Sequence, residues 1–283
     1  MSHIIIPPDD FGVVTSVSKF LTKIADWRKK HSIPVQGYHS HAWFRGHSKR
    51  TYKLEPGVYR PEFTKQAENI YGADIESKRL NLEREMLMEF RTAGASMINS
   101  ENVIVVYFLA QHYGMPTRLL DWTTNPLAAL FFAVRNEMVF DDGDVLVMQP
   151  TKMFSEPPPG SEEPKPYMRT MRHPQIRDSI GMSFWLDPVE KLRCGEPTVK
   201  KYPRILAFRP DNSSGRIGQQ SSCFTLHTHL ATPKNNQTLA RLKITGDRKN
   251  AIREELRQLN INEFTVYNDL DHLSKELRRS WGL

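Results

Sequence analysis

The stretch QHYGMPTRLLDWTTNPLAALFFAV, residues 111–134, contains the strongest structural signals in this 283-residue chain. Its cluster Tyr113-Gly114-Met115-Pro116 predicts a loop, because glycine and proline interrupt regular structure. The short apolar run at residues 118–122 predicts a strand. Asn125-Pro126 then predicts the start of a helix, since a proline in the first helical turn loses no hydrogen bond. We therefore place this loop, strand and helix at the centre of the fold.

Helices and strands are predicted on both sides of this stretch. Apolar residues at helical spacing predict helices at residues 17–27, 74–94, 253–259 and 270–277. Aromatic or apolar runs predict strands at residues 41–45, 144–148, 205–208 and 222–227. Residues 102–111 fit either a helix or a strand. Strands in the middle of the chain with helices around them predict an α+β fold with a central mixed sheet.

The domain organisation is predicted to be simple. We expect residues 1–283 to form a single domain that starts with an N-terminal arm, residues 1–14. Residues 149–200 are expected to be an irregular, proline-rich insertion within that domain. Pro157-Pro158-Pro159-Gly160 indicates this, because proline disfavours both helix and sheet.

The composition is that of a protein with a sizeable core, at 39% hydrophobic and 25% charged residues. No apolar run reaches the roughly 18 residues of a membrane helix, so no membrane association is expected. The N-terminus lacks the features of a secretion signal. The two cysteines, Cys194 and Cys223, make no disulfide framework, and no Cys/His spacing indicates a metal site. We therefore expect a cytoplasmic protein without a metal.

The formal net charge is +7 and the isoelectric point is about 9.3. This surplus fits a nucleic-acid partner, because lysine and arginine displace counterions from phosphates. It fits equally a surface that is only solubilised by its charge. A metal-dependent nuclease has the least support, since Asp141-Asp142 and Asp144 look like a turn and not like a ligand set.

Several motifs resemble those of the FRG family. Phe44-Arg45-Gly46 resembles the tripeptide that names the family, and residues 111–123 and 125–133 resemble its longest signature. Further similar blocks are Tyr52, Leu54, Pro56 and Arg60; Arg216-Ile217, Gln219-Gln220 and Phe224; and Asn268-Asp269-Leu270-Asp271. The resemblance extends from about residue 16 to residue 278.

A more distant likeness is to ADP-ribosyltransferases that use an Arg–Ser–Glu triad. In those enzymes an early strand ends in an arginine, and a later strand with a Ser-Thr-Ser run leads into an alanine-rich helix. Phe44-Arg45-Gly46 resembles the first element and residues 122–133 resemble the second. The likeness implies an ADP-ribosyltransferase-like fold and NAD as the substrate.

The likeness also implies roles for individual residues. Arginine suits the pyrophosphate of NAD, because its planar fork donates two hydrogen bonds at once. We expect Arg45 to bind it, with Arg118 as a second candidate. Thr123 and Thr124 are expected to support the ribose or the catalytic carboxylate. The expected NAD-binding set is completed by Gly46, His112, Gln219 and Gln220.

The catalytic acid is where the sequence departs from the transferases. Their late motif has a glutamate, whereas the matching region here has Gln219 and Gln220. An acid is needed because splitting NAD develops positive charge on the ribose, which a carboxylate stabilises. Asp121 is the first candidate to replace it, and Glu83 and Glu85 are the second.

Each candidate also has a structural interpretation. Arg45 would then form a buried ion pair with Asp121 or Glu85, and Asp121 would cap the following helix or brace Arg118. His112 would be a packed histidine. We expect the aromatic residues Trp122, Phe131 and Phe132 to belong to the core.

Two functions remain open from the sequence. One is an NAD-dependent ADP-ribosyltransferase that acts as a toxin or defence effector on nucleic acid or protein, and that requires a neutralising partner. The other is a non-catalytic module that binds a nucleotide or a protein.

Overall fold

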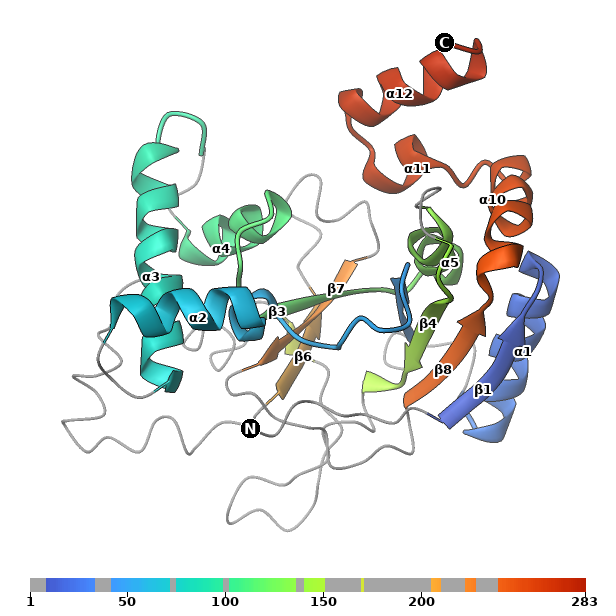
Figure 1. Ribbon diagram of the computed structural model, residues 1–283, viewed down its shortest axis with the longest axis horizontal. Helices are drawn as coiled ribbons and strands as arrows, with labels where there is room; N and C mark the ends of the chain where they lie inside the picture. Colours follow the sequence, from blue (N-terminus) through green and yellow to red (C-terminus); the bar gives the residue numbers. More distant parts are fainter. Residues whose placement is uncertain are drawn as a thin grey trace.

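The computed structural model describes residues 9–33, 42–71, 75–98, 102–135, 140–150, 169–170, 205–209, 222–227 and 239–283 (Figure 1). Its strands are β1 (Asp9–Val14), β2 (Trp43–His47), β3 (Leu119–Thr123), β4 (Gly143–Met148), β5 (Arg169–Thr170), β6 (Ile205–Arg209), β7 (Ser222–His227) and β8 (Leu239–Ile244). The helices of this part of the chain are α1 (Val17–Lys30), α2 (Pro61–Ile70), α3 (Ile75–Ala93), α4 (Val103–His112), α5 (Pro126–Val134), α10 (Lys249–Gln258), α11 (Glu263–Tyr267) and α12 (Leu270–Ser280), with short 3-10 turns η1 (Gly57–Tyr59) and η3 (Gly246–Arg248). The predicted α+β fold with a mixed sheet is confirmed.

The strands form one sheet in the order β1-β8-β4-β2-β3-β7-β6-β5. Pairs β1/β8 and β5/β6 are parallel and the others are antiparallel. The two central strands, β2 and β3, share a single pair, Phe44 with Thr123. In contrast, β2 pairs with β4 over its whole length, as β3 does with β7. The sheet therefore consists of two halves that diverge beyond this one pair, and β3 runs across the direction of β4 and β8 (Figure 1).

Each half of the sheet has its own helix layer. Helices α1, α5 and α10 cover the half with β1, β8, β4 and β2, and their core includes Phe20, Phe44 and Val147. Helices α3 and α4 cover the other half, where Phe108, Phe208 and Phe224 pack together. Successive strand residues point to opposite faces. A third cluster around Trp43, Trp122 and Leu146 accordingly forms on the face opposite the helices.

Local capping signals mark the starts of α1 and α4. Ser16 accepts a hydrogen bond from the Lys19 amide at 3.1 Å, so α1 begins at Val17 as expected. Asn102 does the same for the Ile104 amide at 3.0 Å. Residues 102–111, which fit either structure, are therefore helical.

Gly46 lies inside β2, whereas the predicted strand ended before it. A Cβ atom at this position would lie 1.9 Å from the Ala129 carbonyl oxygen and 2.8 Å from the Ala133 amide nitrogen. Only glycine lets α5 pack this closely against β2. The glycine of the tripeptide is thus required by helix packing.

Several elements were not predicted. Residues 9–14 of the expected N-terminal arm form β1, which pairs with β8 at the edge of the sheet, and neither β8 nor α2 was expected. Most of the expected insertion at residues 149–200 lies outside the described residues. None of the described helices is long and apolar enough to cross a membrane.

Candidate functional site

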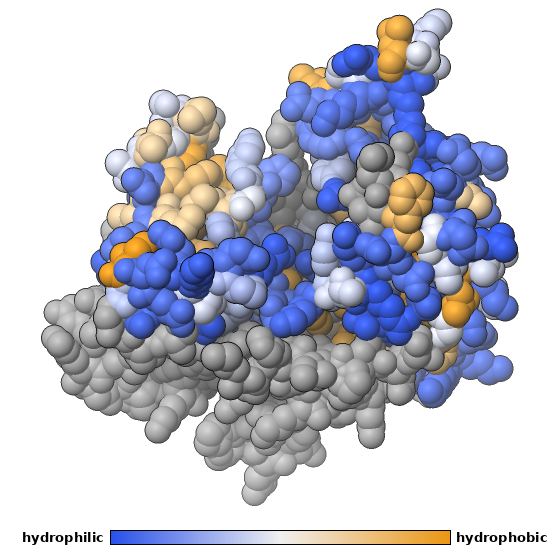
Figure 2. Space-filling view, viewed as in Figure 1, coloured by the Kyte–Doolittle hydropathy of each residue, from blue (hydrophilic) through white to orange (hydrophobic). Residues whose placement is uncertain are grey.

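Two clefts open where β2 and β3 part. The first, the α5 cleft, has a volume of about 410 Å³ and is bordered by β2, β3, α5 and α11. The second, the α2 cleft, has a volume of about 440 Å³ and lies between α2 and the loop that follows α4. Arg45, Arg60 and Asp121 line both clefts. The surface is hollowed between the side formed by α2, α3 and α4 and the side formed by α11 and α12 (Figure 2).

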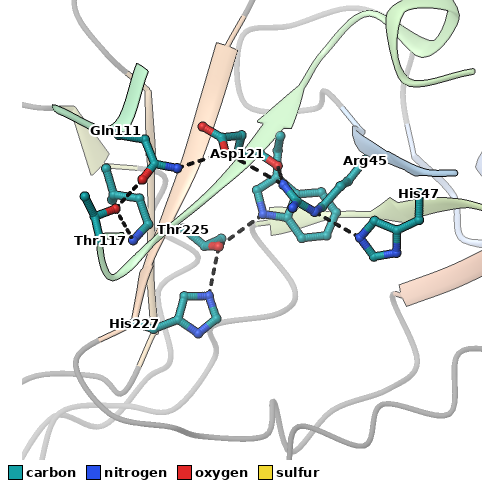
Figure 3. Close-up of polar contacts among 9 residues, drawn as sticks. Arg45, His47, Gln111, Thr117, Asp121, Thr225 and His227 are labelled. Carbon is teal, nitrogen blue, oxygen red and sulfur yellow. Dashed lines mark hydrogen bonds and ion pairs between the residues drawn. The ribbon is translucent and has the colours of Figure 1, made fainter. Parts of the chain in front are cut away.

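Arg45 reaches from β2 across the junction to β3 (Figure 3). Its Nη1 donates a hydrogen bond to the Asp121 carbonyl oxygen at 2.6 Å, and its Nε donates to His47 Nε2 at 3.1 Å. Burial lowers the pKa of Arg45 against the opposing effect of Asp121, and the charge of Arg60 lowers it further. No hydrogen bond within the described part of the chain uses Nη2. The guanidinium is therefore held by two of its nitrogens, and among the described residues Nη2 is the nitrogen left for a ligand.

His47 holds Arg45 from behind. Its Nδ1 lies 3.4 Å from Asp144 Oδ1, and Arg241 Nε lies 2.9 Å from the other oxygen of that buried carboxylate. Burial lowers the pKa of His47, although Asp144 opposes this. A neutral ring with its proton on Nδ1 leaves Nε2 free to accept from Arg45. Charged and polar groups of three strands thus lie behind His47, which accepts the hydrogen bond from Arg45.

Asp121 is the exposed partner in the cleft, with 56% of its side chain accessible. Its Oδ2 accepts a hydrogen bond from Gln111 Nε2 at 3.0 Å and lies 3.9 Å from Arg45 Nη1. Gln111 is oriented in turn by the Thr117 hydroxyl, which donates to its Oε1. Gln111 was part of the quoted signature but was not predicted as a site residue, because its role depends on the meeting of α4 with β3.

Thr123 lines the α5 cleft and Thr124 lines neither of the two clefts. The Thr123 hydroxyl accepts a hydrogen bond from the Asn125 amide at 3.0 Å. Asn125, and not Asp121, caps α5, since its side chain accepts from the Leu127 and Ala128 amides. This corrects the structural interpretation of Asp121 as a helix cap.

Arg118 and Glu83, both predicted as site residues, do not line either cleft. Arg118 Nε donates to Glu83 Oε2 at 2.8 Å, and their side chains are 5% and 0% exposed. Tyr107 and the Arg118 amide donate to the other oxygen of Glu83 at 2.5 and 3.1 Å. Although burial opposes its charge, Glu83 together with Tyr107 raises the pKa of Arg118. A carboxylate enclosed in this way cannot reach a ligand.

Glu85 and His112 also lie outside the two clefts. Glu85 is on the exposed side of α3; burial and the nearby Glu85 carboxylate raise the pKa of Tyr71 to about 12. His112 is exposed at the end of α4, with its ring edge-on to Tyr113. The structure therefore brings Arg45, Asp121 and Thr123 together and separates Glu83, Glu85, Arg118 and His112 from them.

Gln219 and Gln220 lie outside the described residues, so their predicted role remains a prediction. Ser222, the first residue of β7, pairs with Thr123 and lines the α5 cleft. Among the described residues, no group of three His, Cys, Asp or Glu side chains is arranged to hold a metal ion.

Four further residues complete the site and were missed as ligand contacts. Arg60 lines both clefts, and Phe132, Arg135 and Tyr267 line the α5 cleft. The Arg135 guanidinium lies 5.3 Å from the ring centre of Phe132 and 5.8 Å from that of Tyr267. Phe132 was predicted as core; it is only partly buried, whereas Trp122 and Phe131 are core residues as predicted. Arg60 could have been identified as a site residue from its position in the FRG family pattern.

A family profile of the FRG domain matches residues 40–142. The similarity to the FRG domain therefore covers this part of the chain. The matched span is shorter than the resemblance inferred from the sequence, and it contains Arg45, Arg60, Gln111, Asp121, Thr123 and Arg135. It ends before Ser222 and Tyr267, so the matched span supplies most of the residues that line the α5 cleft and the later chain supplies the remainder. Neither a search among curated proteins nor one among solved structures finds a match.

Proposed function

We propose that this FRG domain binds NAD where β2 and β3 part and transfers its ADP-ribose to an acceptor. The observation that supports the proposal is that Arg45, Asp121 and Thr123 line one cleft. These are residues whose sequence context resembles the arginine and Ser-Thr-Ser motifs of the transferases. Likeness between folds does not establish an activity, so the chemistry of these side chains must support the function.

Arg45 is suited to the pyrophosphate. Its Nη1 and Nε already donate hydrogen bonds to Asp121 and His47, so the side chain is oriented before a ligand binds. Binding of a phosphate through Nη2 therefore costs little further side-chain entropy. Hydrogen bonds between a guanidinium and a phosphate are charge-assisted and stronger than neutral ones. The cleft also contains Arg60 and Arg135, whose charges favour the same anion.

Asp121 is suited to the reacting ribose. In the proposed reaction the bond between the ribose C1′ and the nicotinamide nitrogen breaks, and its electron pair leaves with nicotinamide. Positive charge develops on the ribose, and the Asp121 carboxylate stabilises it. A nucleophilic oxygen or nitrogen of the acceptor then forms the new bond to C1′ and releases its proton.

The proposed acceptor follows from the charge of the protein. A net charge of +7 and three arginines in the α5 cleft favour nucleic acid over protein. Modification of a cell's nucleic acid would make the protein a toxin or defence effector, and its host would need a protein that neutralises it.

A nucleotide-binding module without chemistry is the second candidate, and the surroundings of Asp121 favour it. The Asp121 carboxylate already accepts a hydrogen bond from Gln111 and faces Arg45. In the described part of the α5 cleft it is the one carboxylate among three arginines. Such a lining binds phosphates whether or not a bond is broken.

The two functions are separated by incubating the protein with NAD labelled in its adenylate part and with RNA, DNA or protein from cells. Transfer of label by the wild-type protein, and its loss in Arg45→Ala, is the expected result. Glu85→Gln, which lies outside both clefts, is the control and should retain transfer. Binding of NAD without transfer to any acceptor would leave the binding module as the function.

A further inference from the structure

The α5 and α2 clefts meet at the same three residues, Arg45, Arg60 and Asp121. We propose that the two clefts together hold one dinucleotide, with its pyrophosphate between Arg45 and Arg60 and one nucleoside in each cleft. The proposal rests on NAD binding as proposed above and adds where each part of the ligand lies. It also assigns ligand contacts to Arg60, Tyr267 and Met115.

The shared arginines form a site for two negative charges. The charge of Arg60 lowers the pKa of Arg45, so the two cations act on each other across the junction. Within the described part of the chain, no hydrogen bond or ion pair is made by the Arg60 guanidinium. Two like charges beside an open cleft repel each other, and an anion that lies between them offsets this repulsion by attracting both. A pyrophosphate carries one negative charge for each arginine.

The α5 cleft offers a stacking surface for a base. Tyr267 is held by His272, whose ring is parallel to it at 4.0 Å and whose Nδ1 lies 2.7 Å from Asp269. Phe132 meets Tyr267 edge-on at 5.8 Å, and Arg135 lies near both rings. Aromatic rings and guanidinium planes are the groups on which proteins stack unpaired bases. These ring contacts place the stacking surface at the cleft without a ligand.

The α2 cleft offers a second, separate compartment. Its apolar walls are Phe63 of α2, Met115 and Pro116 of the loop after α4, and Leu119 of β3. Gln111 and Glu62 are its polar groups. The volume of each cleft alone is in the lower part of the range of small-molecule sites, roughly 300–1,000 Å³. This volume suits one nucleoside. Two such compartments joined at a pair of arginines match a molecule made of two nucleosides joined by pyrophosphate.

One variant in each cleft tests whether the ligand spans both. Tyr267→Ala removes the stacking surface of the α5 cleft, and Met115→Ala removes an apolar contact of the α2 cleft. Tyr113→Ala and Met97→Ala are the matched controls, since both side chains are exposed and line neither cleft. The dissociation constants of NAD, AMP and nicotinamide mononucleotide are measured by calorimetry, and melting temperatures show whether each variant is folded.

NAD should bind about 5- to 100-fold more weakly to Tyr267→Ala, the range of one lost stacking contact, and measurably more weakly to Met115→Ala. AMP should be weakened by one of these variants and nicotinamide mononucleotide by the other, which identifies the adenosine cleft. Weakening of NAD by one cleft's variant alone would overturn the spanning arrangement, while label transfer by that variant would leave the transferase proposal standing. Wild-type protein that does not bind NAD would overturn both proposals. NAD binding that depends on both clefts without any transfer would overturn only the transferase.

Discussion

Two arginine–carboxylate pairs, Arg118–Glu83 and Arg45–Asp121, differ in burial and geometry. The first pair lies under α3 and α4, with Nε and Oε2 at 2.8 Å and both side chains buried. The second lies at the junction of β2 and β3, with Nη1 and Oδ2 at 3.9 Å and side chains that are 18% and 56% exposed. All four residues were predicted to belong to the site, and only the second pair lines it.

The difference is whether the hydrogen-bonding capacity of the pair is already used. Glu83 receives hydrogen bonds from a tyrosine, a backbone amide and the guanidinium of its partner, so it has little to offer a ligand. In the second pair the arginine is held mainly through the backbone of Asp121 and through His47, which leaves the two charged groups facing an open cleft. A closed pair contributes to the fold, and an open pair to binding.

The largest expected effect is on the stability of the closed pair. Glu83→Gln leaves Arg118 buried without its counter-charge, and removing one partner of a buried pair costs about 3–5 kcal/mol. The free energy of unfolding, measured with denaturant, should fall by this amount. Glu85→Gln on the same helix is the control and should change it by less than about 0.5 kcal/mol. Equal effects in the two variants would contradict the contrast between the pairs.

The next effect is on the chemistry of the open pair. Asp121→Asn keeps the size and the Gln111 contact of the side chain but removes its charge. If Asp121 stabilises the ribose cation, label transfer from NAD should slow about 100- to 1000-fold while the melting temperature stays nearly the same. Asp141→Asn, an exposed carboxylate outside both clefts, should transfer label like wild type. Full transfer by Asp121→Asn would remove Asp121 from the mechanism.

A smaller effect separates the shape of Arg45 from its charge. Arg45→Lys retains the charge, but an ammonium cannot reproduce the planar fork that contacts Asp121, His47 and a phosphate together. We expect NAD to bind about 10-fold more weakly, corresponding to one lost charge-assisted hydrogen bond of about 1.5 kcal/mol. Lys49→Arg outside the clefts is the reciprocal control. Unchanged NAD affinity in Arg45→Lys would mean that charge alone is sufficient.

The smallest effect concerns pH. Burial, and next the nearby charge of Arg45, lowers the pKa of His227 to about 3. The folded protein therefore binds fewer protons than the unfolded chain between pH 6.5 and 3, so its stability falls as the pH falls through that window. The slope from one such group is at most about 1.4 kcal/mol per pH unit.

His227→Gln should flatten this acid-side slope, measured as the free energy of unfolding from pH 7 to pH 4. His112→Gln at the exposed end of α4 should leave the slope unchanged. An identical slope in His227→Gln and wild type would show that the buried imidazole does not govern acid stability.

Sequence patterns were sufficient to predict most elements. They were also sufficient to predict that the open pair, Arg45 and Asp121, belongs to the site. Residues 118–134 form the predicted strand and helix because proline, asparagine and apolar spacing act locally. The closed pair could not be foreseen, since Glu83 and Arg118 come from elements 35 residues apart and only their packing reveals the enclosure. Tyr267 was missed for the same reason. It lies more than 100 residues beyond the signature and reaches the cleft through α11.

The single pair between β2 and β3 explains why Phe44, Arg45 and Gly46 stand next to each other. Phe44 anchors the junction by pairing with Thr123 and by pointing into the core below α5. Strand alternation then turns Arg45 to the opposite face, beside the widening gap, and Gly46 gives α5 clearance one step later. A one-residue insertion ahead of the tripeptide would exchange the faces of all three, because register and face are linked. The three residues therefore act together: Phe44 packs in the core, Arg45 faces the gap between the strands, and Gly46 leaves room for α5. Their order in the sequence is fixed, because each role belongs to one position of the strand.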